Sequence, residues 1–191
     1  MYKRQVFRCV ESVLPLWMQR TIGLGAKYGK ISSLNPAIII VLVPLMQSAL
    51  AKYDLYNSVI LGTAITGVAP FALSLITPAS YGATALFMVV LSIGEAIYSP
   101  RLSDYILRLS PRGSEGAYAS LLSLPNFTVK AFSGTLGGHL LADWCPRPGA
   151  RDCYALWTVE AFIALTGPAA MYGFRSWLYD GHVRARLEAR V

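Results

Sequence analysis

Long stretches without a charged residue alternate with short clusters of charge along the chain. Ile31–Ala51 contains no charge, and Leu55–Gly94 is charge-free over a length that allows two crossings of a membrane with a turn at Pro78. Two more such stretches are 116–129 and 131–142. A crossing needs about 20 mostly apolar residues at roughly 1.5 Å each. The pattern predicts five membrane-spanning helices, over residues 34–51, 57–77, 81–100, 117–142 and 154–175. A sixth helix, shorter and more polar, is predicted over residues 6–23.

A soluble helical bundle is the alternative explanation for these stretches. Soluble helices carry polar residues on one face with a 3.6-residue period. The polar residues of Val59–Ile76, in contrast, are only Ser and Thr. Prolines inside the predicted spans do not argue against helices, because membrane helices tolerate proline where neighbours satisfy the freed backbone groups. We therefore expect an all-α integral membrane protein.

Composition and charge indicate whether the chain binds a membrane or a nucleic acid. The 191 residues are 54% hydrophobic and 14% charged, with 17 Lys+Arg, 10 Asp+Glu and a net charge of +7. Soluble domains carry roughly 25% charged residues, and disordered chains combine low hydrophobicity with high charge. The basic residues lie between apolar stretches and form no stripe of the kind that binds nucleic acid. The expected partner is a lipid bilayer, with no nucleic acid.

The distribution of Lys and Arg among the loops predicts the orientation. With a cytoplasmic C-terminus, eight of these residues lie on the cytoplasmic side and five on the other. This is the bias of the positive-inside rule. Residues 176–191 then form a cytoplasmic basic tail, either at the lipid headgroups or simply solvated.

The cysteines, the histidines and short motifs bear on chemistry. Cys145 and Cys153 flank a loop that we place on the outer side of the membrane, opposite the cytoplasm. A disulfide is possible there if the compartment is oxidising. His139 and His182 are far apart and no Cys-x-x-Cys occurs, so we expect no metal and no cofactor. Ser133 lacks the glycine two positions before it that a serine-hydrolase elbow requires, and we expect no enzyme.

The first residues match the translation of a sequencing adaptor. Tyr2-Lys3-Arg4-Gln5 is what the end of a widely used transposon sequencing adaptor would encode. We interpret residues 1–5 as a sequencing artefact, although an authentic short basic leader is the alternative. On this interpretation the chain is the C-terminal part of a longer protein.

Charged residues inside the predicted spans are the candidates for function. An ionisable group at mid-helix costs at least about 2.5–3.5 kcal/mol on insertion scales, so it usually faces a partner or a water-filled cavity. Glu95 and Glu11 are candidate sites for a proton or a substrate amine, and Lys130 for an anionic group or for pairing with a carboxylate. The structural alternative is a buried Glu–Lys pair that only fixes helix packing. Glu160, in the last helix, is expected to face lipid or headgroups, and His139 to lie at an interface.

Small residues recur in the fifth predicted span. Gly134 and Gly138 form a G-x-x-x-G motif, which permits close approach of a neighbouring helix. Such a surface serves either as a sliding gate or as plain packing.

Two segments resemble a known family of transporters. Asn35–Ile40 followed by Val43-Pro44 resembles the start of the eighth helix of major facilitator superfamily transporters of the proton-dependent oligopeptide group. Val10-Glu11 is similar to the acidic position of that group's seventh helix.

Later segments continue the resemblance. Gly94-Glu95 with Ser99-Pro100 is similar to the group's tenth helix, and Ser110-Pro111 with Gly116 to the following loop and eleventh helix. The order and spacing of these pieces match the family over about residues 6–175. The short loop Lys52-Tyr53-Asp54 departs from the superfamily's signature loop, and the 101–115 loop looks closer to a divergent, protist-like branch.

The resemblance implies roles for single residues. Glu95 would help hold the amino end of a substrate, and Glu11 would serve proton or gate chemistry. The eighth and eleventh helices would shape the cytoplasmic gate. The residues assigned to gating or packing are Pro100, Asn126, Gly134 and Gly138.

Together these observations predict a six-helix C-terminal bundle, helices 7–12 of a major facilitator fold, over residues 6–175. It would move a small solute, coupled to protons, by rocking-type alternating access around a midplane site. Its partners would be the missing N-terminal six-helix half, the solute and protons, and the chain alone would be inactive. The alternative is a self-contained small membrane protein, a channel or oligomeric module without a transport cycle.

Overall fold

The computed structural model describes residues 13–76, 80–111, 113–146 and 153–175, and these residues form helices and connecting turns with no strand among them. The all-α prediction is therefore confirmed. The helices are α2 (Leu14–Thr21), α3 (Tyr28–Ser32), α4 (Leu34–Ala49), α5 (Leu55–Val68), α6 (Phe71–Leu75), α7 (Tyr81–Leu109), α8 (Glu115–Trp144) and α9 (Ala155–Gly173).

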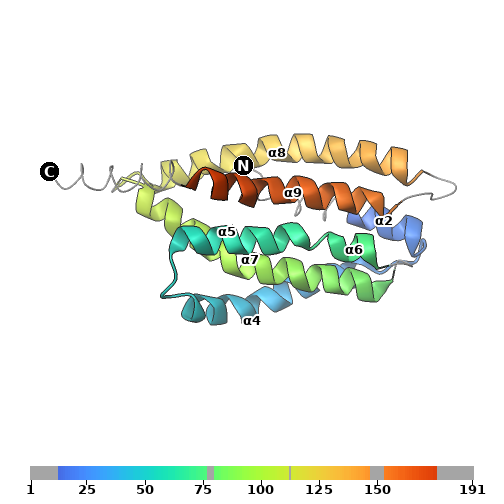
Figure 1. Cartoon of the computed structure of the whole chain (residues 1–191), viewed down its shortest axis with the longest axis horizontal. Coiled ribbons are helices and arrows are strands. Elements are labelled where there is room, and N and C mark those ends of the chain that lie inside the picture. The colour runs from blue at the N-terminus through green and yellow to red at the C-terminus, as the bar shows by residue number, and fades with distance from the viewer. Residues whose placement is uncertain (1–12, 77–79, 112, 147–152, 176–191) are drawn as a thin grey trace.

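The long helices run roughly along one common axis (Figure 1). α7 packs against α4 on one side and against α5 on the other, and α5 also packs against α9. α8 touches α7 and α9. The C-terminal end of α8 and the start of α9 lie at the same end of the bundle as α2 and α6 (Figure 1).

Three helical stretches of the described chain are long and apolar enough to cross a membrane. They are Tyr28–Ala49, Leu55–Leu75 and Tyr81–Asp104. Each coincides with one of the predicted spans, and helices also occupy the predicted spans at 117–142 and 154–175 as α8 and α9. Of the predicted helix over 6–23, α2 forms the described part, and residues 6–12 lie outside the described chain.

The span predicted over 57–77 forms as the helical stretch Leu55–Leu75, with an irregular turn at Ala69 and Pro70. α5 ends at Val68 and α6 begins at Phe71. Pro70 has no N–H to donate to the carbonyl four residues earlier, at Thr66. That carbonyl instead accepts from the backbone N–H of Ala69 at 3.3 Å, which tightens the last turn of α5.

The helix predicted to end at residue 100 continues to Leu109, so the loop predicted over 101–116 was too long. Pro100 lies inside α7 and removes only one backbone hydrogen bond. The following residues place Arg101, Asp104 and Arg108 three and four positions apart. This spacing is compatible with a helix that continues beyond its apolar part.

The helical stretch before residue 49 has one irregular turn. α3 ends at Ser32 and α4 begins at Leu34, and Ser33 between them keeps helical backbone angles (φ −69°, ψ −15°). Pro36 accounts for the irregularity, because it cannot donate to the carbonyl of Ser32 four residues earlier. Tyr28–Ala49 is therefore one helical stretch that lacks a single backbone hydrogen bond at Ser32.

Two glycines allow α5 and α7 to pack backbone against backbone. A Cβ added at Gly62 would lie 2.7 Å from the backbone N of Tyr98 and 2.8 Å from the carbonyl O of Gly94. A Cβ added at Gly94 would lie 2.7 Å from the carbonyl O of Gly62 and would also collide with Thr66 Oγ1. Close approach of this kind is typical of helix pairs in membranes.

Hydroxyl groups buried near this crossing are satisfied within their own helices. Thr66 Oγ1 donates to the carbonyl of Gly62 at 3.0 Å, and Ser92 Oγ to that of Met88 at 2.7 Å. Thr63 Oγ1 donates likewise to Val59 at 2.7 Å. Because such bonds need no water, the hydroxyls can be buried among apolar side chains.

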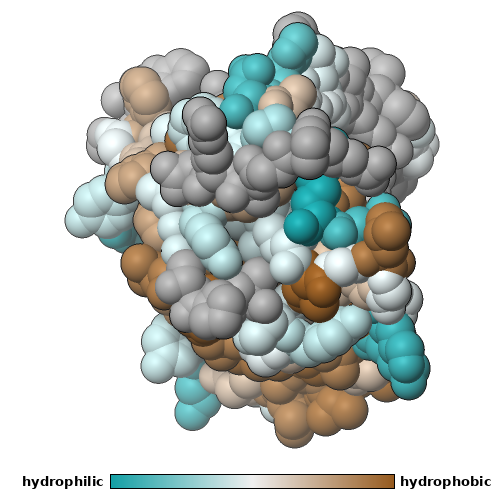
Figure 2. Space-filling view, turned by 90° about the vertical axis from the view of Figure 1, so that its right-hand side faces the viewer, coloured by the Kyte–Doolittle hydropathy of each residue, from teal (hydrophilic) through white to brown (hydrophobic). Residues whose placement is uncertain are grey.

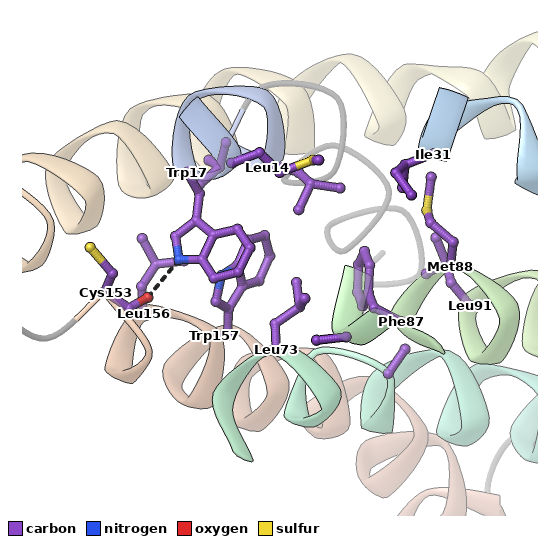
Figure 3. Close-up of a cluster of buried hydrophobic side chains, with 14 of the residues drawn as sticks. Leu14, Trp17, Ile31, Leu73, Phe87, Met88, Leu91, Cys153, Leu156 and Trp157 are labelled. Carbon is purple, nitrogen blue, oxygen red and sulfur yellow. Dashed lines mark hydrogen bonds between the residues drawn. The ribbon is translucent and has the colours of Figure 1, made fainter. Parts of the chain in front are cut away.

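The largest cluster of buried side chains lies at the end of the bundle where α2, α6, α7 and α9 meet (Figure 3). Trp17 and Trp157 pack edge to face with ring centroids 5.6 Å apart, and Phe87 lies 5.8 Å from Trp157. Leu14 and Leu73 complete the centre of the cluster and are fully buried. Aromatic pairs in such arrangements contribute about 0.5–1.5 kcal/mol beyond area burial.

Side chains from neighbouring helices donate to carbonyl groups at three helix C-terminal ends. Arg20 donates to the end of α8. Arg101 Nη2 donates to the carbonyl O of Gln47 in the last turn of α4 at 3.4 Å. Tyr56 Oη donates to the carbonyl O of Met171 near the end of α9 at 2.7 Å. The last carbonyls of a helix have no partner within it. These contacts satisfy some of them and tie the helices together at both ends of the bundle.

The outer side of α4 is apolar and exposed. Ile40, Val41 and Leu45 are 74%, 62% and 55% exposed. Figure 2 views the molecule from the right-hand side of Figure 1. Its lower flank, the side on which α4 lies in Figure 1, is largely hydrophobic. An apolar flank of this length is compatible with lipid contact, since lipid requires no polar face.

Candidate functional site

Glu95 lies between α7 and α4, well inside the apolar stretch Tyr81–Asp104. Its Oε2 accepts a hydrogen bond of 3.0 Å from Nδ2 of Asn35. Both side chains are half-buried. The carboxyl group of Glu95 and the amide of Asn35 thus form a polar contact between two apolar helices.

The position of Glu95 follows from its neighbour in the sequence. Gly94 is buried against α5 at the crossing with Gly62. Because successive helical residues are about 100° apart, fixing Gly94 toward α5 turns Glu95 away from it, toward α4. The glycine crossing thus sets the rotation of α7 that aims the carboxyl group at Asn35.

The start of α4 brings Asn35 into the same place. Asn35 is the second residue of α4 and directly precedes Pro36. Because proline has no N–H, the carbonyl of Ser32 cannot pair with the residue four positions later. The helical path nevertheless continues through Ser33, so Asn35 lies within the stretch Tyr28–Ala49 and its amide donates to Glu95 on α7.

Of the other predicted binding residues, Glu11 lies outside the described residues. Lys130 and Asn126 belong to α8, whose backbone is described at these positions although their side chains are not. The structure therefore places Glu95 in an interhelical contact, and the roles assigned to Glu11, Lys130 and Asn126 stay predictions.

The predicted gating glycines contrast with the glycines of the α5–α7 crossing. Gly134 and Gly138 are exposed, and a Cβ added at either would meet no atom within 4 Å. The close packing expected of a G-x-x-x-G motif is instead found at Gly62 and Gly94, which are separated by 32 positions and form no local motif. Pro100 lies inside α7, six positions after Gly94.

Glu160 has surroundings different from those expected. Glu160 is only 1% exposed, so the expectation that it faces lipid or headgroups was wrong. It lies on the face of α9 that also buries Trp157, Ala161 and Ala164. His139 is exposed on α8.

The structure joins Cys145 to Cys153 in a disulfide, with their Cα atoms 4.7 Å apart. It links the C-terminal end of α8 to the residue two positions before α9. Among the described residues, no group of three or more His, Cys, Asp or Glu side chains is arranged to hold a metal ion.

A double-mutant cycle tests whether the Asn35–Glu95 contact is energetically important. We expect Asn35→Ala and Glu95→Ala to be non-additive, with a coupling energy of about 1.5–3 kcal/mol, because hydrogen bonds to charged groups contribute this much. The measurement is thermal unfolding of the wild type, the two single variants and the double variant in one detergent. Additive effects would mean that the two side chains do not interact in solution.

No family model, no curated protein and no solved structure matches the chain.

Proposed function

We propose that this chain is the C-terminal half of a proton-coupled secondary transporter of the major facilitator type, which moves a small solute by rocking-type alternating access. The observation that carries the proposal is the Glu95–Asn35 contact between two long apolar helical stretches. An ionisable group in such a place is costly, so it usually faces a partner or a water-filled cavity through which an ion or substrate can reach it.

Protonation of Glu95 gives the contact two states. As a carboxylate, Glu95 holds a negative charge against the Asn35 amide and the start of α4. As a neutral acid it loses the charge-assisted part of that hydrogen bond, which weakens the attraction between α4 and α7. A proton arriving from one side would thereby bias the bundle toward one of its two arrangements, since a ligand shifts an equilibrium by its differential affinity for the two states.

The disulfide supports the proposed orientation. Disulfides persist in oxidising compartments, and Cys145 and Cys153 lie at the end of the bundle opposite the end of α4. This end would face the outside or a lumen, and the C-terminal tail would then be cytoplasmic, in agreement with the loop charges. The solute and the N-terminal six-helix half are the partners that the proposal requires.

Complementation by separate halves tests the proposal. We expect the chain alone, reconstituted in vesicles, to give no solute uptake, and co-expression with the six helices encoded upstream to restore uptake. Co-expression with an upstream segment whose first helix is deleted is the control. Flux through the chain alone would contradict the proposal and favour a self-contained channel or oligomeric module.

A further inference from the structure

Three elements meet where α8 ends. Arg20, on α2, donates from Nη1 to the carbonyl of Leu141 at 2.8 Å and also to the carbonyl of Cys145. Leu141 and Cys145 are the last-turn and C-cap positions of α8. The Leu141 carbonyl also accepts from the backbone N–H of Cys145 at 3.1 Å, so Arg20 is its second donor. A cation at the C-terminal end of a helix interacts favourably with the helix dipole.

A second side chain of α2 contacts the other cysteine. The indole Nε1 of Trp17 donates to the carbonyl of Cys153 at 2.9 Å, and the whole of Trp17 is buried (Figure 3). α2 therefore makes a hydrogen bond to the backbone of each of the two residues that form the disulfide. We call this group, Trp17, Arg20 and the Cys145–Cys153 disulfide, the clasp.

The disulfide fixes the distance between the two acceptors. Cys145 ends α8 and Cys153 precedes α9, and the bond holds their Cα atoms 4.7 Å apart. Trp17 and Arg20 are three positions apart and so lie on one side of α2. They can reach both carbonyls together only while the two cysteines stay close. The geometry makes this pair of hydrogen bonds dependent on the disulfide, whereas Leu14 and Trp17 also hold α2 by apolar burial.

We propose that the clasp is a redox-sensitive device: reduction of the Cys145–Cys153 disulfide releases α2 from the ends of α8 and α9. A dithiol reductant supplies two electrons and two protons. The S–S bond breaks, thiols form on Cys145 and Cys153, and the reductant becomes a cyclic disulfide. Because Cys145 and Cys153 are buried, the reductant reaches the bond when this end of the bundle opens locally. The two carbonyls are afterwards no longer held at a fixed separation, and Arg20 and Trp17 lose their simultaneous hold on both. This inference is independent of the proposed transport function.

Hydrogen exchange measured by mass spectrometry tests the device. For this experiment Cys9 of the full chain is replaced by serine (Cys9→Ser). The intact mass then reports the oxidation state of Cys145 and Cys153 alone. We expect reduction by a dithiol to accelerate exchange in residues 14–21 by about tenfold, the effect of losing roughly 1.4 kcal/mol of local stability. Exchange in α5, residues 55–68, should stay unchanged, and reoxidation should restore the original rates.

Two variants separate the device from a plain cross-link. In oxidised Arg20→Gln, exchange in residues 14–21 should already be fast, and reduction should add little. Arg101→Gln removes the α7 arginine that donates to the C-terminal end of α4. This variant should respond to reduction as the wild type does. Unchanged exchange in residues 14–21 after both thiols are detected would overturn the proposal. So would equal acceleration in residues 55–68, or a full response to reduction in Arg20→Gln.

Discussion

Alanine at position 94 should destabilise the bundle by about 1–3 kcal/mol, the usual cost of overpacking a tightly packed site. The added methyl group would lie 2.7 Å from the backbone N of Thr66 and the carbonyl O of Gly62, and backbone atoms cannot move aside as a side-chain tip can. α5 and α7 must therefore separate. Helix propensity acts in the opposite direction, by up to about 1 kcal/mol in favour of alanine, so the measured sign shows which effect dominates.

Thermal unfolding in detergent, followed by loss of the monodisperse species, measures this effect. For a chain of this size, 1–3 kcal/mol corresponds to a fall of roughly 2–12 °C in the melting temperature. Gly62→Ala should behave in the same way, because it meets the same crossing from the other side. Gly134→Ala is the matched control: it lies in α8 with no atom within 4 Å, and should be neutral or slightly stabilising. Equal melting temperatures for Gly94→Ala and Gly134→Ala would refute the close crossing.

The second large effect concerns Glu95→Gln in the complete transporter. Glutamine keeps the size of the side chain and can still accept the hydrogen bond from Asn35, but it cannot exchange a proton. We expect accumulation of solute driven by a proton gradient to be abolished, while exchange of solute across the membrane without a gradient continues. The melting temperature should change by no more than about 4 °C, equivalent to roughly 1 kcal/mol.

Glu160→Gln is the comparison for that experiment. Glu160 is also a buried carboxyl group in an apolar helix, but it lies on α9 and not between α4 and α7. Gradient-driven accumulation should persist in this variant. If Glu95→Gln retains pH-dependent accumulation equal to that of the wild type, Glu95 has no part in proton coupling.

The positions of the helices could be predicted because lipid excludes charge over long stretches. Charge-free segments located α4, α5, α7, α8 and α9, but not the end of α7, which lies at Leu109 beyond the apolar part. The irregular turns were harder to predict, because proline in a membrane helix either disturbs it, as at Pro70, or is accommodated, as at Pro100. Which of these happens depends on neighbouring helices and on which carbonyl groups find another donor.

The candidate site could be predicted only in part. A glutamate in an apolar stretch pointed to Glu95, but its partner could not be identified by charge, since Asn35 is neutral. The signal for Asn35 was its place directly before Pro36 in an apolar segment. The close crossing was missed because Gly62 and Gly94 lie on different helices and form no motif, whereas the local G-x-x-x-G at Gly134 and Gly138 is open.

Infrared difference spectroscopy of the complete transporter tests most directly whether Glu95 changes its protonation state. A protonated carboxyl group has a C=O stretching band separate from those of the carboxylate and the amides. We predict that a change of pH or the addition of solute produces such a band in the wild type and in Glu160→Gln, and that the band is missing in Glu95→Gln. The same band in Glu95→Gln, with unchanged intensity, would contradict the proposal that Glu95 carries the proton.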